Sequence, residues 1–268
     1  MSSSSGDPDA RDRSVEQLVD TCSADARVVA LFEGGSRARG ESDEHSDIDV
    51  TVLVADDALD GMLADKELFV RSIGDALFVE DFGIEHMAFA IFADGTELEI
   101  HFYAASAVDS IRAGPHRVLL DPLGVLANKV FASEEPDDAT RARQLREVVM
   151  WFWHDLGHFT TAIARGQLWW AAGQLEQLRN SCVNLVRLEQ GGEAVDEPYW
   201  KLDTEAATGP LEPLRTTFVP IERDALLRAG NEVLAFFRSH GRAAADAGGL
   251  AYPAELDRLV GGRLDKLT

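Results

Sequence analysis

The sequence predicts an α/β (α+β) fold class, in which a small mixed-sheet domain is followed by an all-helical bundle domain. Two short apolar runs, Val28–Phe32 and Ile48–Val54, flank a glycine turn and a polar loop, and this pattern is typical of two strands. Alternating apolar residues on either side of Asp94-Gly95 predict a hairpin over Glu85–Tyr103, since Asp-Gly is a strong hairpin turn. After about residue 139, apolar residues recur at spacings of three and four, which predicts long helices.

A polar segment, Ser133–Thr140, separates the two patterns. We therefore expect the mixed-sheet domain to span residues 14–135 and the helical domain to span residues 136–268. Residues 1–13 are polar and rich in serine, so we expect a disordered lead-in there.

Apolar spacing and turn residues predict the remaining elements. In the first domain we expect helices over Ser14–Cys22, Ala58–Ile73 and Leu123–Phe131, and short strands over Ala76–Val79 and His116–Asp121. In the second domain we expect helices over Ala139–Arg165, Leu168–Glu189 and Ile221–His240, an irregular stretch over Pro198–Pro220, and a short terminal helix around Pro253–Leu259.

The composition is strongly acidic. The chain of 268 residues has 47 acidic and 25 basic residues, which gives a formal net charge of −22. Nucleic-acid binding normally needs a basic surface, so this charge counts against a nucleic-acid partner and favours a small, cationic substrate. Adaptation to high salt would produce the same charge, and only four of the basic residues are lysines, so both explanations stay open.

Membrane and secretion signals are not found in the sequence. No apolar run reaches the ~18 residues that cross a bilayer, and the N-terminus lacks the apolar core of a signal peptide. We expect no membrane partner, a cytoplasmic location, and two free thiols at Cys22 and Cys182.

Asp47 and Asp49 lie at the start of the second apolar run. Side chains alternate faces along a strand, so these two carboxylates point the same way, with Cα atoms roughly 6.5–7 Å apart. Two carboxylates at that distance can share a pair of cations, which lie about 3.5–4 Å apart in two-metal sites. Mg²⁺ prefers a few carboxylates plus substrate phosphates, and the Gly34-Gly35-Ser36 turn offers backbone N–H groups and a hydroxyl to a phosphate. Together these features imply phosphoryl or nucleotidyl transfer, although Asp-x-Asp alone is common on acidic surfaces.

These residues resemble a known signature. Gly35-Ser36 followed by Asp47-Ile48-Asp49 after a loop, about twenty residues in all, is similar to the signature of the nucleotidyltransferase superfamily that includes DNA polymerase beta. Within that superfamily the chain looks most like the aminoglycoside and lincosamide nucleotidyltransferases, in which a helical domain closes over the acceptor. The resemblance implies a nucleoside triphosphate donor, two Mg²⁺ ions, and a third metal carboxylate on a strand beside the Asp-x-Asp strand.

The resemblance also suggests roles for individual residues. Glu99, between Leu98 and Ile100, fits the third metal carboxylate best, and Glu97, which shares its facing, is the alternative. The family often carries Asp at this position. Under this assignment Asp47, Asp49 and Glu99 form the catalytic metal triad. Gly35 and Ser36 bind the triphosphate, with Arg37, Arg39 and Lys129 helping to neutralise it, and Glu97, His101 or an acid of the helical domain serves as base or substrate contact.

Two further features of the helical region are a pair of histidines and a group of tryptophans. His154 and His158 lie at i and i+4 with Asp155 between them, which is similar to the zinc-protease helix motif. The acid is Asp rather than Glu and the helix belongs to a bundle, so we expect these groups to face a cleft or solvent without zinc. We expect the five tryptophans to pack mainly in the core, with one of Trp169 and Trp170 lining the cleft.

The leading hypothesis is an enzyme that transfers a nucleoside monophosphate, AMP from ATP, to a hydroxyl of a small molecule such as an aminoglycoside or lincosamide antibiotic. One alternative is a protein-AMPylating nucleotidyltransferase of toxin–antitoxin type, against which the long helical region argues. A second is a non-catalytic nucleotide-binding relic of the fold, which would predict a broken triad. The sequence leaves open the acceptor, the choice between ATP and another NTP, the general base, and the oligomeric state, for which a homodimer is one option.

Overall fold

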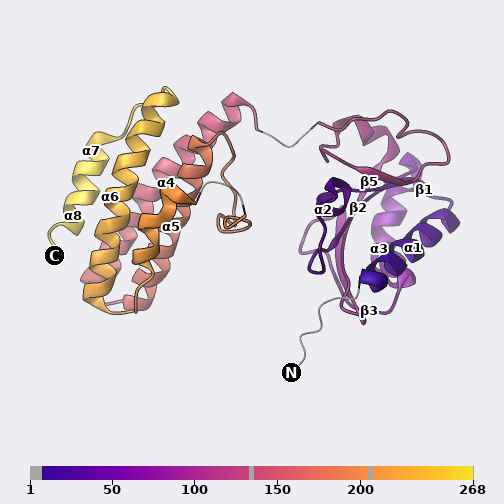
Figure 1. Ribbon diagram of the computed structural model, residues 1–268, viewed down its shortest axis with the longest axis horizontal. Helices are drawn as coiled ribbons and strands as arrows, with labels where there is room; N and C mark the ends of the chain where they lie inside the picture. The colour runs from indigo at the N-terminus through magenta and orange to yellow at the C-terminus, as the bar shows by residue number, and fades with distance from the viewer. Residues whose placement is uncertain (1–7, 133–135, 205–207, 268) are drawn as a thin grey trace. The chain divides into compact units, whose positions relative to one another are not determined.

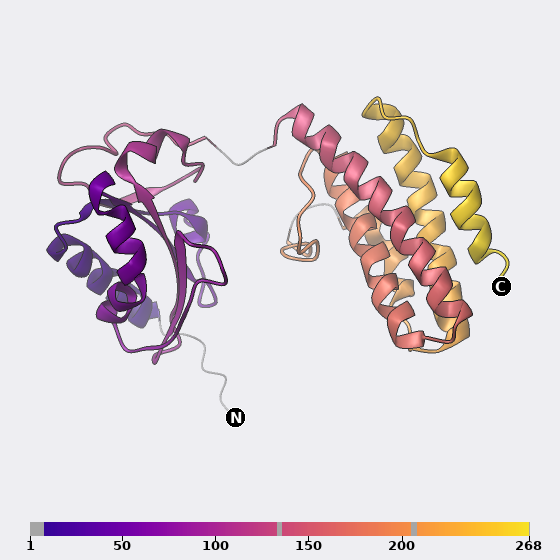
Figure 2. The same cartoon turned by 180° about the vertical axis from the view of Figure 1, so that it is seen from behind.

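The computed structural model describes residues 8–132, 136–204 and 208–267. The chain divides into two compact units, Met1–Glu134 and Glu135–Thr268, which are drawn in indigo to magenta and in pink to yellow in Figures 1 and 2. This division falls one residue before the expected boundary. Residues 133–135 of the expected linker lie outside the described residues, and its last three residues, 138–140, are helical.

A mixed sheet forms the centre of the first unit, as predicted. Its strands are β1 (Val28–Glu33), β2 (Ile48–Val54), β3 (Ala76–Glu80), β4 (Met87–Phe92), β5 (Glu97–Ala104) and β6 (Arg117–Leu120). Their spatial order is β3-β4-β5-β2-β1-β6. The β2–β5 pair is parallel and the other pairs are antiparallel. The predicted hairpin is present as β4 and β5, and the fold class is confirmed.

Two helices cover one face of this sheet (Figures 1 and 2): α1 (Pro8–Ala24) and α3 (Leu59–Ile73), which is preceded by a short 3-10 turn at Asp56–Ala58. Alternate residues of β2 and β5, such as Val50, Ile100 and Phe102, are buried against them. The residues between them therefore point to the other face, which places Asp49, Glu99 and His101 together on that face. The predicted alternation along β5 is confirmed.

The start of α1 corrects the predicted lead-in. Residues 8–13, expected to be disordered, belong to the helix, which begins six residues before the predicted Ser14. Proline is well suited to a first helical turn. The Arg11 side chain is buried and donates hydrogen bonds to the carbonyl oxygens of Asp43 and Glu44. This contact across more than thirty residues fixes the early turns of the helix, and no local pattern reveals it.

The helix predicted over Leu123–Phe131 is wrong, because this segment forms successive turns. The Asp121 carboxylate accepts hydrogen bonds from the backbone N–H groups of Val125 and Leu126, both at 2.9 Å. Asn128, at φ 62°, has left-handed backbone, which a helix cannot accommodate. The segment folds back over the sheet face opposite α1 and α3, where Leu126 and Phe131 pack against Phe32.

Three long helices build the second unit, as predicted: α4 (Asp138–Ala164), α5 (Leu168–Glu189) and α6 (Arg223–Ala247). The predicted irregular stretch contains a 3-10 helix, η3 (Gly209–Thr217). The chain then ends in α7 (Ala254–Leu256), a π-helical turn η4 (Asp257–Gly261) and α8 (Gly262–Leu264). The third long helix extends seven residues beyond its predicted end at His240.

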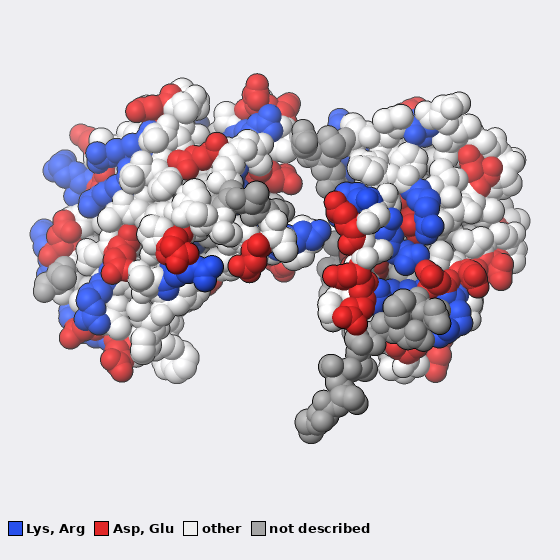
Figure 3. All heavy atoms as spheres, in the orientation of Figure 1, with Lys and Arg blue, Asp and Glu red and all other residues white. Residues whose placement is uncertain are grey.

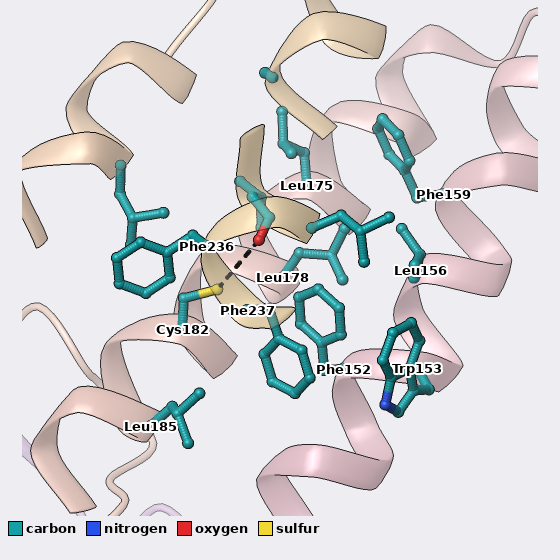
Figure 4. Close-up of a cluster of buried hydrophobic side chains, with 14 of the residues drawn as sticks. Phe152, Trp153, Leu156, Phe159, Leu175, Leu178, Cys182, Leu185, Phe236 and Phe237 are labelled. Atoms are coloured by element: carbon teal, nitrogen blue, oxygen red, sulfur yellow. Dashed lines mark hydrogen bonds between the residues drawn. The ribbon is translucent and has the colours of Figure 1, made fainter. Parts of the chain in front are cut away.

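Aromatic packing joins α4, α5 and α6 into one core (Figure 4). The rings of Phe152 and Phe237 are stacked with centroids 3.6 Å apart, and Trp153 meets Phe237 edge to face at 5.7 Å. The Cys182 thiol donates to the carbonyl oxygen of Val233 at 4.0 Å. Cys22 and Cys182 are both free and buried, and burial raises the pKa of each thiol, so neither behaves as a reactive surface cysteine.

Charged side chains are mixed over the surface. On the face drawn in Figure 3, the described Lys and Arg residues lie among Asp and Glu rather than in a continuous stripe. Many of these charges are paired locally, as in Arg27 with Asp25 at 2.8 Å and Arg71 with Glu67 at 2.9 Å. Across the described part of the chain, none of the helices combines the length and apolar character needed to cross a membrane.

The tryptophans differ from the expectation of core packing. Trp153 is buried, whereas Trp151, Trp169, Trp170 and Trp200 are exposed on the second unit. The apolar spacing along α4 and α5 did not distinguish the buried tryptophan from the exposed ones. Trp151, Phe152 and Trp153 are consecutive, and only a wide apolar stripe would bury all three.

A matched pair of tryptophans tests this core. We expect Trp153→Ala, at a residue 1 % exposed, to lower the free energy of unfolding by about 3–5 kcal/mol. Trp169→Ala, at a residue 82 % exposed, should change it by less than about 0.5 kcal/mol. Trp153→Phe should cost less than Trp153→Ala, because phenylalanine keeps an aromatic ring and leaves a smaller cavity. Urea unfolding followed by circular dichroism measures all three, and equal losses for the two alanine variants would contradict the assignment.

Candidate active site

The glycine turn after β1 packs directly against Asp49. The Gly34 N–H donates to the Asp49 carbonyl oxygen at 3.0 Å, and Gly35 has φ +60°. A Cβ atom built on Gly35 would lie 1.8 Å from the Asp49 Oδ2. Both the left-handed backbone and the close approach therefore require glycine here, and the turn and the carboxylate are held as one structural feature.

The expected Gly-Gly-Ser turn continues as a short helix, α2 (Gly35–Arg39), which carries Ser36 in its first turn. Gly40, at φ +73°, ends this helix, and its N–H bonds to the Arg37 carbonyl oxygen. The loop that follows returns the chain to β2.

The sheet brings the predicted carboxylates together. In the parallel β2–β5 pair, Asp49 lies opposite Glu99, and Asp47 immediately precedes β2. Burial raises the pKa of Asp49 to about 6, and the negative charges of Asp47 and then Glu99 add to this increase. The three acids thus form one region of concentrated negative charge.

Glu99 is hydrogen-bonded to His101. The His101 Nε2 lies 2.8 Å from the Glu99 Oε1, and this bond lowers the pKa of Glu99 below its ordinary value. The other ring nitrogen of His101, Nδ1, is buried without a hydrogen-bond partner among the described residues. The His101 ring lies near His86 and Tyr103, with centroid distances of 5.8 and 6.2 Å. Glu97, two residues before Glu99 on the same strand face, is exposed.

The predicted cationic residues separate into two groups. The positive charge of Arg39 partly opposes the increase in the pKa of Asp49, and the Arg39 Nε bonds Glu41 at 2.8 Å. Arg37 instead bonds Asp12 at 3.0 Å and Glu33 at 3.4 Å. Lys129 pairs with Asp109. Of the three, Arg39 is the one whose charge affects the pKa of Asp49.

Glu33 is a residue that the sequence did not single out. It ends β1, it is fully buried, and its Oε1 accepts a hydrogen bond from the Arg117 Nε of β6 at 2.6 Å. Together with its bond to Arg37, this carboxylate ties the start of α2 to two strands. A buried acid at a strand end has no local signature, because its partner Arg117 lies 84 residues away.

The donor atoms suit a hard cation. Asp47, Asp49 and Glu99 offer only carboxylate oxygens, which Mg²⁺ prefers. A cation would relieve the repulsion that, after burial, contributes to the raised pKa of Asp49. Glu99 directs one oxygen to His101, and the oxygens of the three acids do not all lie within 4.8 Å of one another. Cation binding would therefore draw the carboxylates closer together.

The contact between Gly35 and Asp49 can be tested with two glycines. We expect Gly35→Ala to displace the Asp49 carboxylate and to abolish Mg²⁺-dependent ATP binding. Gly40→Ala has the same left-handed strain, about 1–2 kcal/mol, but its Cβ would meet open space. It should therefore keep the binding. Calorimetric titration with ATP and Mg²⁺ compares the two, and equal loss in both variants would mean that strain rather than the carboxylate contact is responsible.

The pKa of Asp49 predicts a pH-dependent effect on stability. Its ordinary value is 3.8 and its folded value is about 6, so the folded state binds more protons between these values and stability falls as pH rises through this window. We expect Asp49→Asn, which lacks the charge, to melt roughly 2–5 °C above the metal-free wild type at pH 8. The difference should shrink as the pH falls to 5. A gap that does not change with pH, measured by calorimetric melting in EDTA, would contradict this account.

A family model described as streptomycin adenylyltransferase matches residues 10–264. No curated protein matched the sequence. Among solved structures, the chain is similar to an aminoglycoside 6-adenyltransferase from Bacillus subtilis, with 15 % identity, coverage of 95 % of this chain and 97 % of that chain, and a TM-score of 0.46. At this level of similarity, the likeness to the solved structure does not bear on function.

The family match covers nearly the whole chain, including both units and every residue of the carboxylate site. The chain therefore belongs to the streptomycin adenylyltransferase family and is a nucleotidyltransferase.

Proposed function

We propose that the protein transfers AMP from ATP to a hydroxyl group of an aminoglycoside, with streptomycin as the first candidate acceptor. The observation that carries this proposal is the packing of the Gly34-Gly35 turn against Asp49, beside Asp47 and opposite Glu99. A phosphate-binding turn fixed against clustered carboxylates is the arrangement that metal-assisted nucleotidyl transfer needs. The family description supports the adenylyl group and the class of acceptor.

In the proposed reaction, the acceptor oxygen bonds to the α-phosphorus and the bond from that phosphorus to the bridging β-phosphate oxygen breaks. Pyrophosphate leaves with the bonding electrons, and the hydroxyl proton passes to a base. Asp47, Asp49 and Glu99 would hold two Mg²⁺ ions. When bound, these ions neutralise charge on the α-phosphate and on the leaving pyrophosphate. The backbone at Gly35 and the Ser36 hydroxyl would bind the triphosphate, and Arg39 would add positive charge beside it.

Of the predicted candidates for the base, which were Glu97, His101 and an acid of the helical domain, the geometry of β5 favours Glu97 over His101. His101 has its Nε2 bonded to Glu99 and its Nδ1 buried, so neither nitrogen is open to a substrate hydroxyl. We assign His101 the role of orienting Glu99. Glu97 is exposed on the same strand face and can reach a substrate.

A hollow in the second unit suits the acceptor. It has a volume of about 640 Å³ and lies between α4, α5 and the 194–198 segment. Its lining includes the acids Glu147, Asp155 and Asp196, together with Trp151. Carboxylates attract the ammonium groups of an aminoglycoside, and an exposed aromatic ring can pack on a sugar face. We propose that this hollow takes part in acceptor binding.

Pyrophosphate release tests the reaction. We expect turnover with ATP, Mg²⁺ and streptomycin, and roughly a 10²-fold or greater loss of kcat in Asp49→Asn, since interactions with developing charge carry several kcal/mol. His45→Ala, at an exposed histidine of the same unit, is the matched control and should stay active.

A panel with other aminoglycosides and lincomycin defines the acceptor, and Glu147→Gln with Asp196→Asn should raise KM for the acceptor without changing KM for ATP.

The outcomes separate the parts of the proposal. Turnover with lincomycin and not with aminoglycosides would overturn the acceptor class while leaving adenylyl transfer intact. ATP binding that needs Mg²⁺ and Asp49, without turnover on any small acceptor, would favour a protein acceptor. Absence of any nucleotide binding by the folded protein would overturn the proposed transferase activity.

A further inference from the structure

We propose that His154, Asp155 and His158 form a transition-metal site on α4, with Zn²⁺ as the representative ion. Each side chain offers one ligand atom, and these three atoms all lie within 4.8 Å of one another. Within the described ranges, this is the one group of three or more His, Cys, Asp or Glu residues that satisfies this distance. The sequence motif led us to expect no zinc here, and the distances between ligand atoms revise that expectation.

The spacing of the three residues explains why one helix can supply the whole set. His154 and His158 are i and i+4, and Asp155 and His158 are i and i+3, so all three are neighbours on one surface of α4. The two imidazole rings have centroids 4.3 Å apart and an interplanar angle of 63°. Because a regular helix fixes this arrangement, no distant loop has to close to assemble the ligands.

Asp155 is the anchored member of the group. Its side chain is 13 % exposed, and its Oδ1 lies 2.8 Å from the His154 Nδ1. His154 is 49 % exposed, and His158 is also exposed. A carboxylate that bonds one ring nitrogen orients the imidazole and presents the other nitrogen to a metal. Asp155 therefore holds His154 in place with one carboxylate oxygen while its carboxylate supplies the third ligand to the ion.

The surroundings restrict the rings and provide an optical signal. The Trp151 ring meets His154 edge to face at 5.0 Å, and Trp170 of α5 lies 5.6 Å from His158. Aromatic neighbours on both sides limit the positions of the two imidazoles. They also place two tryptophans close enough to report a bound paramagnetic ion by fluorescence quenching.

The donor set selects the class of metal. Two imidazole nitrogens and one carboxylate suit Zn²⁺, Ni²⁺ and Cu²⁺, whereas Mg²⁺ prefers oxygen ligands alone. Ligands about 2.0–2.2 Å from a tetrahedral Zn²⁺ lie about 3.3–3.6 Å from each other. Atoms within 4.8 Å therefore reach this geometry by small rotations of the two exposed imidazoles toward Asp155. Three protein ligands leave the fourth position open to water or another small ligand.

Metal binding to the full-length chain, without a histidine tag and after treatment with EDTA, tests the proposal. Excess Mg²⁺ is present throughout so that the carboxylates of the first unit are occupied. We expect one Zn²⁺ per chain by elemental analysis, and quenching of tryptophan fluorescence by Cu²⁺. Cu²⁺ should bind more tightly than Zn²⁺. His154→Ala and His158→Ala should each weaken Zn²⁺ binding at least tenfold, and Asp155→Asn should weaken it by about 10–100-fold.

A matched control is available in His45→Ala, at a histidine that is 73 % exposed and belongs to the other unit. It should bind Zn²⁺ as the wild type does. Circular dichroism confirms that the variants fold, as expected for exposed positions on a helix. No Zn²⁺ on the folded wild type, or equal Zn²⁺ on the wild type and the double variant His154→Ala/His158→Ala, would overturn the proposal. Neither result depends on nucleotide binding, so this test is independent of the proposed reaction.

Discussion

The contact between the Gly35 backbone and the Asp49 carboxylate is the constraint on which the rest of the first unit depends. Because a Cβ at Gly35 would lie 1.8 Å from the Asp49 Oδ2, the turn that would bind phosphate packs against the acid that would bind metal, with room only for glycine. The backbone bond from Gly34 to Asp49 also joins the turn to β2. The buried Glu33, bonded to Arg37 and Arg117, then fixes α2 to the strands on which the turn rests.

Strand pairing in the sheet places further acidic side chains beside this contact. Parallel pairing of β2 with β5 sets Glu99 opposite Asp49, and the alternation of side chains places both on the face that α1 and α3 do not cover. The apolar residues between them supply the core that keeps the two strands in register. The same packing leaves Asp49 partly desolvated beside two other acids, which raises its pKa to about 6. Carboxylates clustered to bind a cation repel one another and destabilise the folded state while the cation is absent. Apolar burial on the other face of the sheet offsets this destabilisation.

The sequence predicted best where a pattern is local. The alternation along β5, the Asp-Gly hairpin and the three- and four-residue spacings of the bundle identified the strands, the long helices and the facing of Asp49 and Glu99. It failed where polar side-chain contacts, which no apolar spacing encodes, determine the structure. Two of these contacts join distant residues, namely Arg11 with the Asp43 carbonyl and Arg117 with Glu33, and a third is local, from Asp121 to the backbone of the turns that follow it. The tryptophans show a second limit, since consecutive aromatic residues cannot be assigned to core or surface without knowing which side of the helix is covered. The roles of Ser36, Arg39, Lys129 and Glu97 stay predictions.

The net charge of −22 is a poor guide to where cations would bind, because acidic side chains of the described residues are commonly exposed or paired with arginine, as Asp25 is with Arg27. What distinguishes the two proposed metal sites is the donor type and the element that places it. In the first unit, oxygen atoms from β2 and β5 converge because the strands pair in register, which suits a hard ion held jointly with phosphates. In the second unit, two imidazoles and a carboxylate converge because one helix repeats every 3.6 residues, which suits a borderline ion. Backbone periodicity therefore gives each proposed site its own geometry, and the difference in donor atoms gives each a preference for a different class of metal.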